Sequence, residues 1–169
     1  MKKLIVLGLL LIPLINCYSQ TKKEQRQQKK QEEYETVKAL IETKHYEFSA
    51  NRAHPQKGGF VDLTTNPNYL RVNDNFTEAS MPYFGRAYNI PYGGPGGIKF
   101  KGEVNGYSVV ENSKKLNLVV SYKVQGNGDS FDCVLTINSK TSATLIITSQ
   151  QRDPISYFGA INVLETKEE

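Results

Sequence analysis

The stretch that decides the fold is residues 116–149, LNLVVSYKVQGNGDSFDCVLTINSKTSATLIITS. Apolar and polar residues alternate within three segments of it, Leu116–Gln125, Ser130–Ser139 and Ala143–Ser149. Successive side chains of a β-strand point to opposite faces, so this alternation is typical of half-buried strands. Because the connecting loops are short, the simplest arrangement of the three strands is an antiparallel meander.

The same alternation continues outward from this stretch, beginning at His45 and reaching the end of the chain. Further strands are expected at His45–Arg52, Gly59–Leu63, Tyr69–Asn73, Phe76–Met81, Ile98–Phe100, Tyr107–Asn112 and Ile155–Val163. Turn residues such as Asn105–Gly106 separate them. Many short strands at this spacing predict a mainly β fold, an antiparallel barrel or a sandwich, with a helix over one open end or face.

One amphipathic helix is expected before the strands. Its apolar residues recur at helical spacing, and the pattern is strongest over Glu32–Thr43. Residues 20–33 are almost entirely Gln, Lys, Glu and Arg, so they form either a polar tether or the solvated start of the helix. Residues 34–169 are then a single β domain with this helix at its N-terminal end, a length that suits one core.

Residues 1–19 have the features of an export signal. A charged start precedes the apolar run Leu4–Ile15, which is too short for a membrane-spanning helix, and a small-x-small cleavage pattern ends at Ser19. Cleavage there predicts a periplasmic or secreted domain. The alternative is lipidation of Cys17, which would anchor the protein to the outer membrane. Asn16 stands where a lipobox usually has a small residue, which favours the soluble form.

Cleavage after Ser19 leaves Cys133 as the only cysteine, so packing must hold the fold without a disulfide. Its neighbours on the same face of the expected strand are Phe131, Leu135 and Ile137. A thiol among apolar side chains lacks the electropositive, partly exposed setting of a reactive cysteine. We therefore expect a buried structural thiol.

Composition and motifs argue against several classes of function. The formal net charge of +4 is too small to indicate a nucleic-acid partner. The two histidines, His45 and His54, have no second ligand at a spacing typical of zinc sites. The glycines of Gly93–Gly97 lead into a strand, whereas phosphate and dinucleotide loops lead into a helix. Neither a metal nor a cofactor is expected.

The candidate ligand-binding residues lie in the unusual stretch 81–98, MPYFGRAYNIPYGGPGGI. They are Tyr83, Phe84, Arg86, Tyr88 and Tyr92. Loops of this length inside a small domain are uncommon unless they are functional or pack on themselves. The aromatic rings could line a groove for a sugar, peptide or lipid, with Arg86 binding a carboxylate or phosphate. The alternative is a satellite core in which the rings are buried and Arg86 pairs with an acid.

Several motifs together resemble the bacterial family named Domain of Unknown Function 4251. They are Met81–Ala87, Pro91–Gly93, Gly97–Phe100 and Ile155–Gly159, and the resemblance extends over roughly Ile41–Val163. It implies an exported envelope protein of a Gram-negative bacterium with a lipocalin-like β-barrel. No activity is established for the family, so the resemblance assigns no catalytic residues.

We expect a non-enzymatic exported binding or interaction domain of the bacterial envelope, whose loop and barrel mouth hold a small apolar or aromatic ligand or an envelope protein. One alternative is a hydrolase or lyase of an envelope glycan or peptide. It would combine Arg86 and Tyr83 with one of the scattered carboxylates, Asp62, Glu78, Glu103 or Asp129. Another is a structural spacer tethered by residues 20–33. A membrane partner is expected only if Cys17 is lipidated.

Overall fold

The structure, a computed structural model, describes residues 21–88, 96–126 and 128–165. Within them one helix, α1 (Lys22–Glu42), precedes nine strands. The strands are β1 (His45–Pro55), β2 (Val61–Asp62), β3 (Tyr69–Asn73), β4 (Phe76–Pro82), β5 (Gly97–Asn112), β6 (Asn117–Gly126), β7 (Asp129–Ser139), β8 (Ser142–Ser149) and β9 (Ile155–Val163).

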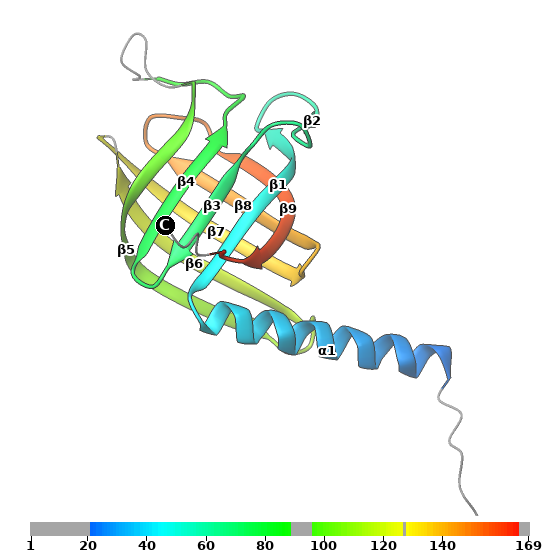
Figure 1. Ribbon diagram of the computed structural model, residues 1–169. Helices are drawn as coiled ribbons and strands as arrows, with labels where there is room; N and C mark the ends of the chain where they lie inside the picture. Colours follow the sequence, from blue (N-terminus) through cyan, green and yellow to red (C-terminus); the bar gives the residue numbers. More distant parts are fainter. Residues whose placement is uncertain (1–20, 89–95, 127, 166–169) are drawn as a thin grey trace, which may run out of the picture.

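Eight of the strands form a closed antiparallel barrel (Figure 1). Neighbours follow the order β1-β3-β4-β5-β6-β7-β8-β9, and β9 pairs back onto β1 to close the ring. The short strand β2 lies outside this ring and pairs antiparallel with the C-terminal part of β1, through Arg52–Asp62 and Ala53–Val61. The mainly β prediction is confirmed, and of the two architectures left open the chain adopts the barrel. The meander β6-β7-β8 is also confirmed.

Two predicted strand boundaries were wrong. Ile98–Phe100 and Tyr107–Asn112 belong to one long strand, β5, because Asn105–Gly106 is a bulge within it and not a turn. Gly106 has a φ of 66°, which its missing Cβ allows, so the strand bends there and continues. The expected strand Gly59–Leu63 is reduced to the two residues of β2.

The seam between β1 and β9 depends on Gly159. The pairing shifts by a residue between Ala50 and Arg52, where β1 carries a bulge. A Cβ built on Gly159 would overlap the carbonyl oxygen of Ser49 and lie 2.7 Å from the Ala50 Cα. Glycine is therefore required where these two backbones approach each other.

Apolar side chains fill the interior of the barrel. The large ones that are almost completely buried include Tyr46, Tyr157, Phe48, Phe131, Leu70, Met81, Ile98, Leu118, Leu135 and Ile137. Cys133 is completely buried among them, and burial raises the pKa of its thiol to about 12. The prediction of a buried structural thiol is thereby confirmed.

A few hydroxyl groups lie within this core and bond to each other. Thr77, the one buried polar residue in the described part of the chain, donates to the carbonyl oxygen of Arg71 at 2.9 Å. Its Oγ1 lies 3.1 Å from the Tyr122 hydroxyl, and the hydroxyls of Tyr46 and Tyr107 are 3.4 Å apart. Burial raises the pKa of Tyr122 well above its ordinary value, so this hydroxyl stays neutral.

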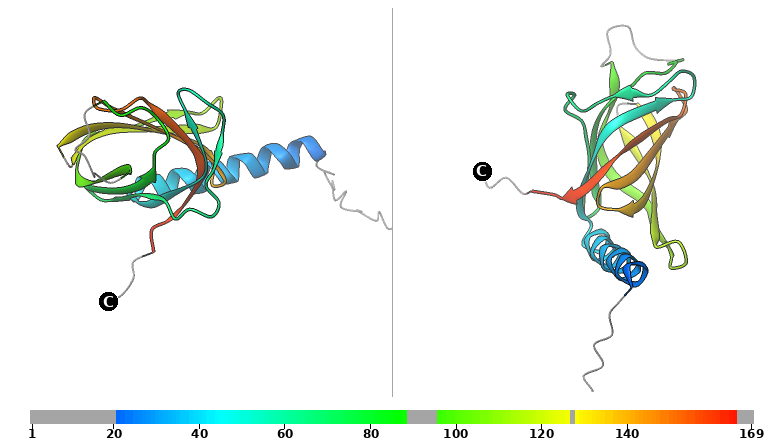
Figure 2. Two further views of the ribbon diagram at one scale, coloured as in Figure 1. Left: turned by 90° about the horizontal axis from the view of Figure 1, so that it is seen from above. Right: turned by 90° about the vertical axis from the view of Figure 1, so that its right-hand side faces the viewer.

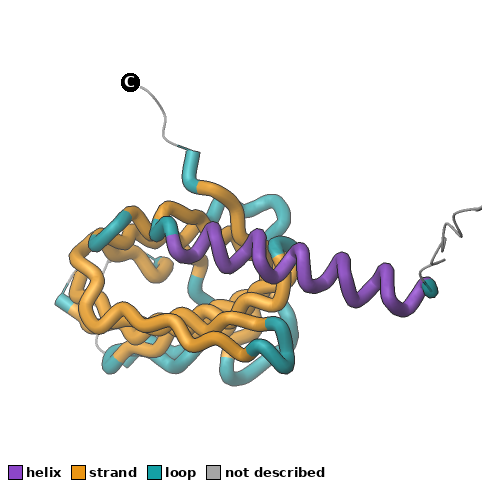
Figure 3. Tube along the Cα trace, turned by 90° about the horizontal axis from the view of Figure 1, so that it is seen from below, coloured by secondary structure: helices purple, strands orange, loops and turns teal. Residues whose placement is uncertain are grey.

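The helix α1 crosses one end of the barrel and extends past it (Figures 1 and 3). It begins at Lys22, ten residues before the strongest part of the predicted helix, because Thr21 and Glu24 form a capping box. Its expected apolar residues are the buried ones, Tyr34, Val37, Leu40 and Ile41. None of the helices in the described residues is long and apolar enough to span a membrane.

A carboxylate on the barrel fixes the helix from one side. Glu111 of β5 accepts a hydrogen bond from Lys38 at 2.8 Å and another from the Tyr34 hydroxyl at 3.3 Å. The ammonium group of Lys38 lowers the pKa of Glu111, which keeps this acceptor ionised near neutral pH. Because apolar burial ends at Tyr34, the first three turns of α1 extend into solvent.

Candidate functional site

The candidate residues Tyr83, Phe84, Arg86 and Tyr88 follow β4 at one end of the barrel. Beside them runs the connection from β8 to β9, and the two segments meet in an antiparallel bridge between Ala87 and Arg152. Backbone bonds flank the bridge. Tyr88 N–H donates to the Gln151 carbonyl at 2.8 Å, and Asp153 N–H donates to the Arg86 carbonyl at 3.0 Å. The two segments therefore form one hydrogen-bonded unit, which we call the end platform, residues 83–88 and 151–153.

Tyr83 holds the end platform together from beneath. Its hydroxyl donates to the Arg86 carbonyl at 2.6 Å and to the Asp153 carbonyl at 3.1 Å. The ring is partly buried and packs against the core, and this burial raises the pKa of its hydroxyl. A Cβ on Gly85 would lie 2.6 Å from the Tyr83 Cζ, so the absence of a side chain at Gly85 leaves room for the Tyr83 ring. Tyr83 is thus a support for the platform, which matches the satellite-core alternative for this residue.

Tyr88 is displayed on the outer side of the platform. The side chain is 66% exposed, yet its hydroxyl donates to the Asp153 carboxylate while its own N–H is held by Gln151. The bond to Asp153 raises the pKa of the Tyr88 hydroxyl, so the ring is presented in its neutral form. An exposed aromatic ring fixed at both ends loses little conformational entropy when a partner covers it.

Arg86 and Phe84 are the other large exposed side chains of the platform. Phe84 is 39% exposed, and Arg86 is exposed and lies close enough to Tyr88 to influence its ionisation. The Arg86 guanidinium has no ion-pair partner within residues 21–88, 96–126 and 128–165. Among the described residues the platform therefore presents Arg86 without an ion-pair partner, near the exposed ring of Tyr88.

Arg152 joins the platform to the start of β5. Its Nη1 donates to the Gly97 carbonyl at 2.9 Å, and its guanidinium carbon stands 5.3 Å from the centre of the Tyr83 ring. The buried Nε of the same side chain has no acceptor within the described residues. From β9, the Tyr157 hydroxyl donates to the Pro82 carbonyl at 2.7 Å. These contacts fix both ends of the 81–98 stretch to the barrel.

Two predicted site residues lie outside the described residues, namely Tyr92 of the aromatic set and the lipidation candidate Cys17. Asp153 is a further residue of the site, which no sequence motif had indicated. It is 65 residues from Tyr88 along the chain, so no local pattern pairs them.

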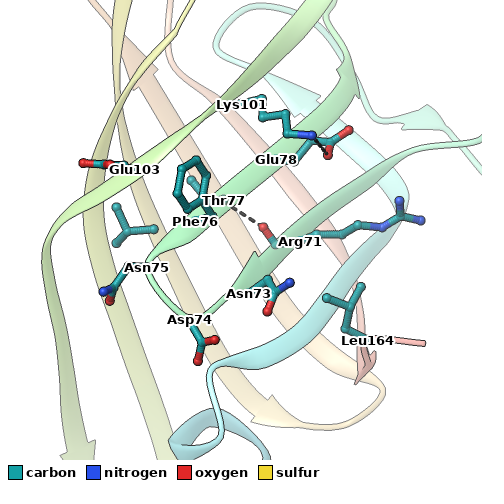
Figure 4. A pocket seen from close by; sticks show the side chains of 11 residues that line it. Arg71, Asn73, Asp74, Asn75, Phe76, Thr77, Glu78, Lys101, Glu103 and Leu164 are labelled. Atoms are coloured by element: carbon teal, nitrogen blue, oxygen red, sulfur yellow. Dashed lines mark hydrogen bonds and ion pairs between the residues drawn. The ribbon is translucent and has the colours of Figure 1, made fainter. Parts of the chain in front are cut away.

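Within the described residues none of the four carboxylates considered for a catalytic site bonds directly to the platform, although Asp129 lines a hollow with Gln151. Asp62 bonds to Thr64 beside β2, and Asp129 accepts from Ser149 at 2.6 Å. Glu78 and Glu103 lie on the outer wall of the barrel, around the concavity shown in Figure 4. Within the described residues no group of three or more His, Cys, Asp or Glu could hold a metal ion.

That concavity has a volume of about 880 Å³ and lies on the outside of β3, β4 and β5. Figure 4 shows Glu78 and Lys101 turned toward each other, 3.6 Å apart, and Glu78 also accepts from Tyr69. Arg71 pairs with Glu47 at 2.6 Å. Because these charged side chains already pair with one another, they are less available to a ligand than Arg86 of the end platform. Phe76, which also lines the concavity, is 50% exposed.

The fold and the platform define the class of the protein as a small closed β-barrel with a filled interior and a rigid aromatic surface at one end. The model of the family described as a domain of unknown function, DUF4251, matches residues 28–161. The chain therefore belongs to the DUF4251 family.

A solved structure shares this fold. A DUF4251 family protein from Bacteroides eggerthii is 24% identical, and the match covers 78% of this chain and 87% of that chain with a TM-score of 0.60. The search of the curated proteins found no match.

Proposed function

We propose that this protein is an exported, non-enzymatic binding domain that recognises its partner with the end platform. The observation that carries the proposal is the arrangement of Tyr88. It is the most exposed aromatic side chain described, and both its backbone and its hydroxyl are fixed by residues 151–153. Rigid, exposed tyrosines beside a free arginine are typical of the energetic centre of binding surfaces.

The partner chemistry follows from the exposed groups. Arg86 favours a carboxylate or phosphate, which a guanidinium binds with two parallel hydrogen bonds. Tyr88 and Phe84 favour an aromatic, apolar or sugar surface next to that anion. The partner is therefore a molecule or chain segment that carries an anionic group close to an apolar or aromatic group.

The filled interior favours surface recognition over a ligand enclosed in the barrel. Most inward side chains of the ring are at most a few per cent exposed, including Phe48, Phe100 and Leu145, whereas Val104 and Tyr107 of β5 are partly buried. The interior of a small barrel is either filled by side chains or holds one ligand. In this barrel side chains fill the interior. The geometry therefore favours recognition at residues 83–88 over a ligand held within the barrel.

The ionisation of the platform tyrosines favours binding over catalysis. The pKa values of both Tyr83 and Tyr88 are raised, the first by burial and the second by its bond to Asp153. A tyrosine acting as a nucleophile or general base needs a lowered pKa, so neither is prepared for that role. The supporting evidence for export is the leader-like pattern of residues 1–19.

The proposal is tested by thermal unfolding of the protein with fractions of its native host's extract, separated into small molecules, glycans and proteins. A fraction that contains the partner raises Tm for the wild-type protein. The double variant Arg86→Ala/Tyr88→Ala is expected to lose this increase. The control Lys101→Ala/Phe76→Ala removes the same kinds of side chain from the outer concavity and is expected to retain it. A control that loses the increase while the platform variant keeps it would move the site to the concavity.

A further inference from the structure

The part of α1 that extends past the barrel carries five cations, Lys22, Lys23, Arg26, Lys29 and Lys30. At 3.6 residues per turn they fall within about 120° of the helix circumference, so they form one face, which we call the basic face. All five are exposed, and their side chains line a common hollow together with Gln27 and Glu33. The other three carboxylates of the exposed segment, Glu24, Glu32 and Glu35, lie on the opposite side of the helix.

This sorting of charge is unfavourable for the helix itself. Lys22 and Arg26 are four residues apart, as are Arg26 and Lys30, and like charges at that spacing repel each other. None of the five cations has an ion-pair partner among the residues that the structure describes. A helix that only needed solubility would intersperse the two signs, because Glu and Lys four residues apart stabilise it.

The basic face is turned toward the side of the helix on which the barrel lies. Stepping by three or four residues from Lys22 through Arg26 and Lys30 leads to Val37 and Ile41, which are buried against the barrel. Figures 1 and 2 agree that the first turns extend beyond the barrel. The basic face and the barrel wall therefore form two sides of a corner.

We propose that this corner binds an acidic polypeptide segment of a partner protein. Charge complementarity calls for several carboxylates, spread over the roughly 12 Å that eight residues of helix span. A narrow chain can lie along all five cations. A flat bilayer cannot, because it would meet the barrel wall and reach only the tip of the helix at Lys22 and Lys23.

The test measures the fluorescence anisotropy of a labelled deca-glutamate peptide titrated with the purified protein. The variant Lys29→Gln/Lys30→Gln removes the two cations nearest the barrel. We expect its affinity for the peptide to fall about tenfold and to depend less on salt concentration than that of the wild-type protein. The control Gln28→Glu/Gln31→Glu changes the net charge by the same amount on the opposite face, and less than a threefold change is expected. Circular dichroism establishes that both variants keep α1.

Vesicles of three parts phosphatidylethanolamine to one part phosphatidylglycerol supply the second arm. Binding to these vesicles that depends on Lys22 and Lys23, together with peptide binding that ignores Lys29 and Lys30, would overturn the proposal in favour of a membrane surface. Equal losses in the Lys29→Gln/Lys30→Gln variant and its control would also overturn it, because the attraction would then come from net charge alone.

Discussion

The hydroxyl of Tyr83 donates to the backbone carbonyl of Arg86, three residues later, at 2.6 Å, and also to the carbonyl of Asp153 on the neighbouring segment. One partly buried side chain thus fixes the backbone of both segments of the end platform. The Tyr88 hydroxyl also bonds to Asp153, but the Tyr88 ring is exposed, whereas the Tyr83 ring packs against the core.

Removal of these two hydroxyls should have different consequences for stability. Tyr83→Phe removes a hydroxyl that bonds to two carbonyls in a partly buried place. The Arg86 carbonyl keeps the Asp153 N–H as a donor, whereas the Asp153 carbonyl loses its bond to Tyr83. The free energy of unfolding is expected to fall by about 1–2 kcal/mol. Tyr88→Phe acts at an exposed bond and is expected to change it by less than about 0.5 kcal/mol. Urea unfolding followed by circular dichroism measures both. Equal effects would contradict the distinction between a supporting and a displayed tyrosine.

Substitution of Gly159 should open the seam of the barrel. A methyl group there overlaps the Ser49 carbonyl on β1, so Gly159→Ala is expected to cost about 2 kcal/mol or more through displaced backbone. Gly59 has no atom within 4 Å of the equivalent position, so Gly59→Ala is the matched control and should stay within about 0.5 kcal/mol of the wild-type protein. A Gly159→Ala protein as stable as its control would mean that β1 and β9 do not close as described.

The thiol of Cys133 should be inert in the folded protein. Its pKa of about 12 leaves roughly one molecule in ten thousand ionised at pH 8, and the side chain is completely buried. Alkylation by iodoacetamide, followed by peptide mass mapping, is expected to modify Cys133 only in denaturant. Rapid modification without denaturant would show that the barrel opens near β7.

Stability should fall steeply in alkali. Burial raises the pKa values of Tyr46, Tyr122 and Tyr157 above the ordinary value near 10. Since the folded state holds the neutral hydroxyls, their contribution is complete below about pH 10 and is lost as the pH rises toward the raised values. Tyrosinate absorbance is expected to develop in two stages, first the exposed rings and later the buried ones together with unfolding. A single unperturbed titration would contradict the burial.

Much of the strand pattern could be predicted because the residues themselves alternate. The apolar faces of β6, β7 and β8 are visible in residues 116–149, and their burial follows from a period of two. Closure could not be predicted in the same way. It depends on the pairing of β1 with β9, which are more than a hundred residues apart, and the same alternation would suit a sandwich.

Local patterns also failed where tertiary structure overrides them. Asn105–Gly106 is typical of a turn, but the ladder with β6 continues on both sides of it, so β5 bends at a bulge and goes on. The aromatic residues of the candidate site were visible in the sequence, whereas their separate roles were not. Tyr83 and Tyr88 differ only in which way the fold turns them against residues 151–153.

The most direct test of the account is two-dimensional ¹⁵N–¹H NMR of the labelled protein, titrated with the extract fraction that raises its Tm. If the end platform is the binding surface, amide shifts move at residues 83–88 and 151–153 and stay constant around Phe76 and Lys101. Shifts confined to the outer concavity or to amides facing the barrel interior would contradict the claim that the end platform is the binding surface.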